Sequence, residues 1–180
     1  ERERMKKSKP KVIAVVGPTA SGKTSYAVSL AHKFNGEIVS ADSRLVYKGF
    51  DIGTAKPSLE ECEGVPHHMI DIVEPEIDYS AGLFAEEAKK AVDDILSRGK
   101  TPIVAGGTGL YFRLLLENYD VPKVPPDYEL REKLSAYTYD ELRKMLEKFD
   151  PQRAAEIELN DKKKVIRAIE MAEHLEKPLS

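Results

Sequence analysis

The residues that decide the fold are VIAVVGPTASGKT, at positions 12–24. VIAVVG (12–17) is a short, wholly apolar run that ends in glycine, as expected of a strand buried on both faces of a parallel sheet. GPTASGKT (17–24) fits the pattern G-x-x-x-x-G-K-[ST], and apolar residues at helical spacing follow it over 23–34. This motif requires a strand before it and a helix after it. The sequence therefore predicts a loop that binds a polyphosphate or a diphosphate.

Each residue type in this loop has a chemical reason. Gly17 and Gly22 let the backbone turn so that successive N–H groups point at phosphate oxygens, and the start of the next helix adds its positive end. Lys23 supplies a mobile positive charge, and Thr24 offers a hydroxyl to Mg²⁺, the cofactor that we expect. The predicted diphosphate- or nucleotide-binding residues are Gly17, Pro18, Thr19, Ala20, Ser21, Gly22, Lys23 and Thr24.

Strand and helix patterns alternate along the first two thirds of the chain. After 12–17, the further strand candidates are EIVSAD (37–42), HHMIDIV (67–73) and TPIVAGG (101–107). Ser80 is a good N-cap for a helix that Gly99 ends. The alternation predicts an α/β fold with a mostly parallel sheet, flanking helices and a phosphate-binding (P-loop) core over 11–118.

The pattern changes after about residue 118. VPKVPP (121–126) interrupts the chain, and every later segment has helical spacing, with a capping box at Thr138 and Glu141 and a cap followed by proline at Asp150–Pro151. We therefore expect a helical insertion over 119–160 and a helix over 161–180 that returns to the core. Residues 1–10, ERERMKKSKP, are expected to form a flexible charged arm.

Asp42 ends the second predicted strand, at the edge where parallel sheets bind their ligands. The fourth predicted strand ends in GGTG (106–109), which holds no acid of the kind that binds Mg²⁺ in the usual nucleotide hydrolases. Three interpretations of Asp42 are open at this point: an acid near Mg²⁺, a general base acting on an acceptor, and a capping residue in a turn. The adjacent histidines His67 and His68 would point to opposite sides of a strand, which favours hydrogen bonding over metal binding.

Composition excludes several classes of protein. The chain has 180 residues, a formal net charge of −3 and one cysteine. It has no apolar run long enough to span a membrane. The single cysteine rules out an internal disulfide framework, and we expect a cytoplasmic protein that makes no membrane contact and is a monomer. The slightly acidic balance argues against a protein that coats nucleic acid through overall charge.

Six blocks in one order resemble a known family. They are GPTASGKT (17–24), SADSRLVYKGFDIGTAKP (40–57), GVPHHMIDIVEP (64–75), YSAGLF (79–84), GGTGLYF (106–112) and NDKKKVIRAIE (160–170). Together they are similar to the tRNA dimethylallyltransferases, also called adenosine tRNA isopentenyltransferases. The 40–57 block is far more specific than the phosphate-binding loop.

This resemblance implies an activity, partners and site residues. The family transfers a dimethylallyl group from dimethylallyl diphosphate to N6 of adenosine 37, beside the anticodon, and its helical insertion clamps the anticodon stem-loop of the tRNA. By resemblance, the catalytic residues are Asp42 as general base, Thr19 as the hydroxyl at the bridging oxygen, and Lys23. The tRNA-binding residues implied are Asp42, Ser43, Arg44, Leu45, Thr108, Arg131, Lys163, Lys164, Val165, Ile166 and Arg167.

Two departures from the family pattern and three rival functions stay open. The family often has arginine where Lys164 stands, and its members continue much further, so we expect this chain to lack the C-terminal part with the last strand of the sheet. One rival is a free-nucleotide isopentenyltransferase acting on AMP, ADP or ATP, and a second is a small-molecule P-loop kinase. The third is a catalytically incomplete fragment that binds RNA or phosphate.

Overall fold

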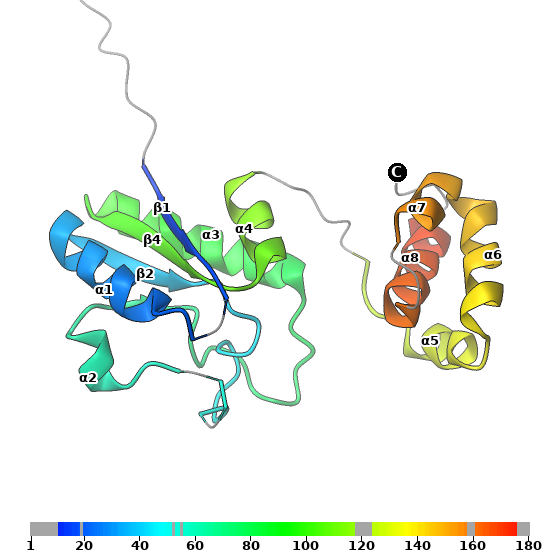
Figure 1. The fold of residues 1–180 in the computed structure, drawn as a ribbon, viewed down its shortest axis with the longest axis horizontal. Helices are drawn as coiled ribbons and strands as arrows, with labels where there is room; N and C mark the ends of the chain where they lie inside the picture. Colours follow the sequence, from blue (N-terminus) through cyan, green and yellow to red (C-terminus); the bar gives the residue numbers. More distant parts are fainter. Residues whose placement is uncertain are drawn as a thin grey trace, which may run out of the picture. The chain divides into compact units, whose positions relative to one another are not determined.

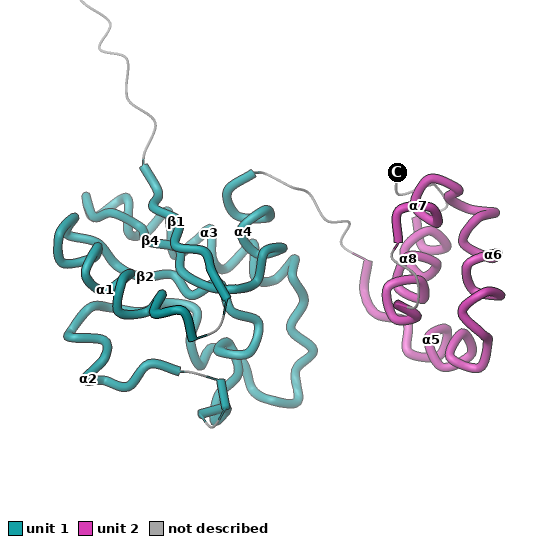
Figure 2. Tube along the Cα trace, viewed as in Figure 1, with its two compact units in different colours: residues 1–121 teal, residues 122–180 magenta. Residues whose placement is uncertain are grey.

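The computed structural model describes residues 11–18, 20–51, 53–54, 56–117, 124–157 and 161–175. The chain divides into two compact units, 1–121 and 122–180 (Figure 2). The expected arm at 1–10 and the predicted hydroxyl of Thr19 lie outside the described residues. Each unit is described by itself.

Unit 1 is built on a four-stranded parallel sheet (Figure 1). The strands are β1 (Ile13–Val16), β2 (Gly36–Ser40), β3 (His67–His68) and β4 (Thr101–Gly106), in the order β1-β4-β2-β3. All three pairings are parallel, with Ile13 opposite Ile103 and Ile38 opposite both Ile103 and His67. The α/β class and the parallel sheet predicted from the sequence are therefore confirmed.

The third strand is shorter than the pattern 67–73 predicts. Met69 and Asp71 have φ angles of 66° and 54°, a left-handed conformation that an extended strand does not contain. Pairing therefore stops after His68. The alternation of apolar residues in HHMIDIV did not reveal this, because side-chain periodicity says nothing about the sign of φ.

Helices cover both faces of the sheet (Figure 1). The helices of this unit are α1 (Lys23–Phe34), α2 (Leu59–Cys62), α3 (Ala81–Ser97) and α4 (Gly109–Leu116). One core cluster packs Ala27, Val28 and Ala31 of α1 against Val15, Ile38 and Ile103 of the sheet. The other packs Phe84, Ala88 and Ile95 of α3 and Tyr111 and Phe112 of α4 against Val39 and Val104. Neighbouring residues of one strand thus serve opposite cores, as the strand period of two requires.

The helix caps predicted for α3 are present. The side chain of Ser80 accepts a hydrogen bond from the backbone N–H of Leu83, and Gly99 takes a φ of 70° just past the end of the helix. A left-handed residue there lets the chain leave the helix toward β4.

A buried carboxylate joins the starts of the central strands. Glu37 of β2 is 2% exposed, and its oxygens accept hydrogen bonds from Arg98, Lys100 (2.7 Å) and His68 (2.7 Å). The Arg98 guanidinium holds the pKa of Glu37 far below its ordinary value against the opposing effect of burial, and Lys100 and His68 lower it further. The hydrogen bonding expected for His68 at the strand edge is thereby confirmed.

Unit 2 consists of helices only, in the part that the structure describes. They are α5 (Tyr128–Ser135), α6 (Tyr139–Phe149), α7 (Pro151–Glu156) and α8 (Lys162–Leu175). The capping box at Thr138 and Glu141 and the Asp150–Pro151 helix start are both present. Leu134, Leu142, Leu146, Val165 and Ile169 form a separate core. Helix α8 therefore packs with α5 and α6, whereas its expected return to the α/β core stays a prediction.

Among the described residues, no helix is long and apolar enough to cross a membrane.

Gly106 gives the first testable prediction. A Cβ at this position would lie 2.2 Å from the carbonyl oxygen of Ala41, which is backbone and cannot swing aside. We expect Gly106→Ala to lower the free energy of unfolding by about 2 kcal/mol or more, measured by urea denaturation. The matched control is Gly109→Ala, because nothing lies within 4 Å of a Cβ there. Equal stabilities of the two variants would contradict this account of the sheet edge.

Glu37 gives a pH-dependent prediction. Because the pKa of Glu37 is lowered in the fold from 4.5, the stability that its charge contributes is present above that value and is lost as the pH falls below it. We expect Glu37→Gln to cost about 2 kcal/mol near neutral pH, and the difference from the wild type to shrink as the pH approaches about 3. Urea denaturation at several pH values measures this, with the exposed Glu76→Gln as control. A difference that grew on acidification would refute it.

Candidate functional site

The loop between β1 and α1 has the backbone shape of a phosphate cradle. Gly22 is the N-cap of α1 with a φ of 78°, and Ala20 has a φ of 63°. No side chain of the N-cap residue occupies the first N–H groups of α1, so they stay available to an anion. The glycine at 22 therefore serves the left-handed turn that points the loop at its ligand.

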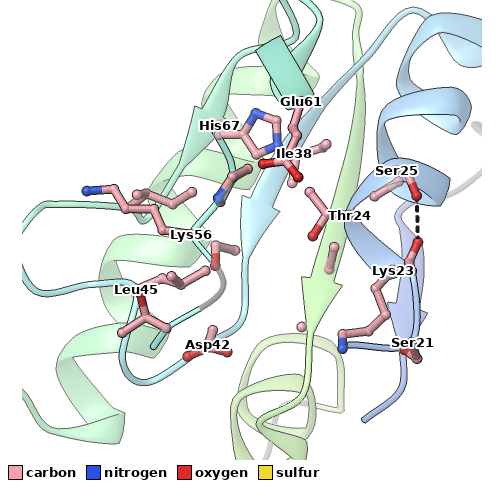
Figure 3. A pocket seen from close by; sticks show the side chains of 18 of the residues that line it. Ser21, Lys23, Thr24, Ser25, Ile38, Asp42, Leu45, Lys56, Glu61 and His67 are labelled. Carbon is pink, nitrogen blue, oxygen red and sulfur yellow. Dashed lines mark hydrogen bonds between the residues drawn. The ribbon is translucent and has the colours of Figure 1, made fainter. Parts of the chain in front are cut away.

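Lys23 and Thr24 follow directly, at the start of α1. The Lys23 ammonium group donates a hydrogen bond to the carbonyl oxygen of Pro18, so it lies over the loop rather than in bulk solvent. Thr24 is half-buried, and Ser25 donates from its hydroxyl to the carbonyl oxygen of Gly22 at 3.0 Å (Figure 3). The motif thus places a cation and a hydroxyl beside the same row of backbone N–H groups.

A cavity of about 420 Å³ opens beside this loop, a size that suits a small organic ligand (Figure 3). The loop contributes Ala20 to Thr24 as one wall. The other walls come from β2, β4 and the long 43–80 segment, and their side chains include Ile38, Ser40, Asp42, Leu45, Thr54, Lys56, Pro57, His67, Ile70 and Ala105. The cavity is thus lined by cationic, hydroxyl and apolar groups together with the carboxylates of Asp42, Glu61 and Glu63.

Asp42 lines this cavity together with Lys23, as the strand-end argument predicts. Its Oδ1 accepts a hydrogen bond from the backbone N–H of Arg44 at 2.8 Å. Asp42 therefore does cap a turn, which was one of the three interpretations. The hydrogen bond from Arg44 fixes the orientation of its carboxylate. A fixed carboxylate in a ligand cavity remains suited to receive a proton.

The residues after β2 and β4 are joined at one edge of the sheet. The N–H of Ser43 donates to the hydroxyl of Thr108 at 3.3 Å, and the N–H of Thr108 donates to the carbonyl oxygen of Ala41 at 3.2 Å. Ser43 and Arg44 are exposed beside the half-buried Asp42. The structure therefore brings together the 42–45 segment and Thr108, which lie far apart in the sequence.

Gly106, the first glycine of GGTG, has a structural role that the sequence did not show. Gly106 lines the cavity, but its closest approach is to the backbone of Ala41. The absence of a side chain thus serves first the contact between two strand ends, and only then the approach of a ligand.

Ion pairs tie the 43–80 segment together. Lys56 pairs with Asp51 at 2.6 Å and with Asp71, and Lys48 pairs with Glu74 at 2.6 Å. Hydrogen bonds to Asp51 and Asp71 raise the pKa of Lys56, so it stays charged. These ion pairs therefore hold in place the segment that supplies one wall of the cavity.

His67 lies at the far end of the cavity from Asp42 (Figure 3). Its Nδ1 is 2.8 Å from the carbonyl oxygen of Val65, and burial lowers the pKa of the ring. A hydrogen-bonded imidazole with a lowered pKa is neutral at physiological pH.

Most of the basic residues singled out in the sequence lie in unit 2. Lys163 and Lys164 are exposed on α8, and Lys164 pairs with Asp161 at 3.0 Å. Arg131 and Arg167, from α5 and α8, both bind the buried carboxylate of Glu170.

Two predicted contact residues of unit 2 face inward. Val165 is 1% exposed within the hydrophobic core, and Ile166 packs against that core. The side chain of Val165 therefore stabilises the helices and does not reach solvent.

Sequence reasoning did not assign a role to Glu170, Lys56 or Ile70. For Glu170, the spacing of three residues from Arg167 on one helix was an available signal, because such pairs meet on a helix surface. For Lys56 and Ile70 there was none, since their place in the cavity depends on the path of a long loop.

Comparison with known proteins finds relatives over most of the chain. The family model described as IPP transferase matches residues 45–180. A tRNA dimethylallyltransferase of Thermomicrobium roseum is 52% identical over 171 residues, which are 93% of this chain and 52% of that protein. One of Carboxydothermus hydrogenoformans is 49% identical over 94% of this chain and 56% of its own length.

Solved structures give the same result. The tRNA isopentenylpyrophosphate transferase of Bacillus halodurans matches with a TM-score of 0.62 and 43% identity, over 92% of this chain and 56% of that one. A eukaryotic dimethylallyltransferase acting on tRNA matches with a TM-score of 0.75 and 34% identity, over 92% of this chain and 44% of that one.

The chain spans about half the length of the curated relatives that it matches. With its phosphate cradle, its strand-end acid and three quarters of its length under one family model, the chain belongs to the IPP transferase family.

Proposed function

We propose that this chain carries the diphosphate site and the acceptor-facing acid of a tRNA dimethylallyltransferase. The reaction would move a dimethylallyl group from dimethylallyl diphosphate to N6 of adenosine 37 in the anticodon loop of a tRNA. The observation that carries the proposal is that the loop before α1 and Asp42 line the same cavity. Relatives about half identical to this chain are named tRNA dimethylallyltransferase.

The reaction depends most on the groups that bind the leaving diphosphate. The carbon–oxygen bond of the allylic diphosphate breaks, the carbon–nitrogen bond to N6 forms, and diphosphate leaves with the bonding electrons. The exocyclic amine of adenine is a weak nucleophile because its lone pair is delocalised into the ring. Groups that neutralise the leaving diphosphate therefore contribute most, and here these are the loop N–H groups and Lys23, with Thr19 proposed at the bridging oxygen.

The residues present suit Mg²⁺. The ion is bound in proteins by few side chains, together with phosphate oxygens and water. The hydroxyl of Thr24 lines the cavity and would hold it there. Among the described residues no group of three or more His, Cys, Asp and Glu could hold a metal by itself, so the diphosphate must supply ligands. When bound, the ion neutralises charge on the leaving group.

Asp42 would accept the proton that N6 loses. Its carboxylate is half-buried and held by the N–H of Arg44, beside the exposed residues Ser43 and Arg44. The target adenosine must leave its stack to reach this position, which costs less in a loop than in a duplex. Ser43, Arg44, Leu45 and Thr108 are then the residues around the incoming nucleotide.

The presence of unit 2 favours RNA over a free nucleotide as the acceptor. A mononucleotide needs no separate helical unit, whereas α5 and α8 carry the cationic side chains of Arg131, Lys163, Lys164 and Arg167. Phosphate contacts of this kind give most of the affinity for a nucleic acid. We therefore include these four residues in the proposed tRNA contact.

Lys23→Ala tests the diphosphate site. The loss of a cation that lies over the loop should weaken binding of inorganic diphosphate roughly tenfold to a hundredfold, measured by titration calorimetry. Lys33→Ala is the control, because Lys33 is exposed at the other end of the same helix. Equal affinities in the two variants would remove the loop from the mechanism.

Asp42→Asn tests the general base. The variant should lose transfer by roughly 10²–10⁴-fold while it keeps its affinity for inorganic diphosphate. Asp93→Asn, an exposed change on α3, is expected to leave both unchanged. Single-turnover transfer and calorimetry on the same preparations separate the two properties. A variant that lost diphosphate affinity as well would reassign Asp42 to the phosphate site.

The function as a whole is tested by supplying labelled dimethylallyl diphosphate with three acceptors: an anticodon stem-loop with adenosine at position 37, AMP and ATP. Label on the RNA alone is the expected result. Label on AMP or ATP would identify a free-nucleotide enzyme instead. Absence of label while diphosphate still binds would show that this chain is an incomplete part of the catalyst.

A further inference from the structure

Glu170 is a buried carboxylate at the meeting point of three segments of unit 2. It lies on α8 and is 2% exposed. Its Oε1 accepts hydrogen bonds from the backbone N–H of Asp127 at 2.6 Å and from Nε of Arg131 at 2.9 Å. Its Oε2 accepts from Nη2 of Arg131 at 3.0 Å and from Nη1 of Arg167. One side chain thus orders the start of α5 and two guanidinium groups.

Both arginines are fixed at two points each. Arg131 meets both oxygens of Glu170 in the two-pronged geometry that sets the plane of a guanidinium. Arg167 binds Glu170 through Nη1 and the carbonyl oxygen of Val124 through Nη2, at 2.7 Å. Yet 34% of the Arg131 side chain and 33% of the Arg167 side chain stay exposed. Each guanidinium is therefore anchored inside while part of its side chain reaches solvent.

The charges of this cluster do not suit a purely structural role. Burial raises the pKa of Glu170, but the hydrogen bonds from Arg131 and Arg167 outweigh it, so the pKa is lowered and the carboxylate stays ionised. A buried ion cluster is a poor way to stabilise helices, because apolar residues of similar volume do as well or better. What it does supply is a fixed arrangement of two phosphate-binding side chains.

We propose that Glu170 is a positioning residue that holds Arg131 and Arg167 as a preorganised pair for the phosphate backbone of RNA. Glu170 does not touch the RNA, since it is buried and negative. Without it, each long side chain would lose rotamer freedom on binding, which preorganisation avoids. This inference rests on the proposed tRNA acceptor. The ring of Tyr128, 62% exposed and 5.7 Å from the Arg131 guanidinium, adds a surface on which a base can stack.

For the substitution Glu170→Gln, an electrostatic role and a positioning role of Glu170 predict opposite changes in RNA affinity. Glu170→Gln removes a negative charge next to two arginines, so charge alone predicts tighter RNA binding and a steeper dependence on salt. Positioning predicts the reverse, because the amide no longer holds two guanidinium groups. A merely structural role predicts a lower melting temperature with an unchanged salt dependence of the folded protein.

The experiment measures binding of an anticodon stem-loop RNA to the whole chain by fluorescence anisotropy at several salt concentrations. The matched control is Glu173→Gln, which removes the same charge from an exposed position of the same helix. We expect Glu170→Gln to bind about tenfold more weakly than the control and to have a salt slope smaller by about one. Affinity equal to or tighter than that of Glu173→Gln would overturn the proposal.

Two further variants keep the test decisive if Glu170→Gln unfolds. Glu170→Asp is ionised but one methylene shorter, so it should fold and bind RNA with intermediate affinity; wild-type affinity in a folded Glu170→Asp would count against the proposal. In a chain that already carries Arg131→Gln and Arg167→Gln, Glu170→Gln should cause no additional loss. An additional loss there would show that Glu170 acts by another route.

The same titration separates this inference from the proposed function. If the wild-type chain failed to bind the stem-loop, the proposed tRNA acceptor itself would fall. If the wild type bound the stem-loop and the affinity of Glu170→Gln equalled that of Glu173→Gln, only the positioning role of Glu170 would be refuted.

Discussion

The close contact between the ends of β2 and β4 is the constraint on which the site depends. Gly106 approaches the carbonyl oxygen of Ala41 so closely that no side chain fits between them. The same carbonyl accepts the N–H of Thr108, and Thr108 in turn accepts the N–H of Ser43. This chain of contacts places Asp42 at the edge of the cavity that the phosphate-binding loop also lines. A small displacement there would move Asp42 away from the loop before α1.

The two units divide the chemistry between them. Unit 1 holds a cavity lined by the loop before α1, by Asp42 and by apolar residues such as Ile38 and Leu45. In unit 2, two arginines share one buried carboxylate. Both units have slightly more acidic than basic residues, so a local arrangement rather than a total decides where a polyanion binds. Each unit has a charged side chain whose orientation is fixed by hydrogen bonds. Asp42 accepts one from a backbone N–H, and Arg131 donates two to Glu170.

Where prediction from the sequence succeeded, the relevant physics was local. The strand–loop–helix at 12–34, the caps at Ser80, Thr138 and Asp150, and the end of α3 at Gly99 all depend on residues a few positions apart. Where it was inaccurate, the missing information concerned backbone conformation or distant contacts. The third strand ends early because Met69 and Asp71 have positive φ, and Val165, inside a segment chosen by resemblance, turns inward.

The sequence by itself determined the fold class, the strand–loop–helix at 12–34 and the position of Asp42 after a strand end, because periodicity and motif spacing encode these directly. Only the tertiary structure decided which distant residues meet. Lys56 and Ile70 line the cavity because a long loop folds back over it, and Glu170 joins α5 to α8 across almost forty residues of chain. Such contacts follow from how whole elements pack, and no local spacing specifies them.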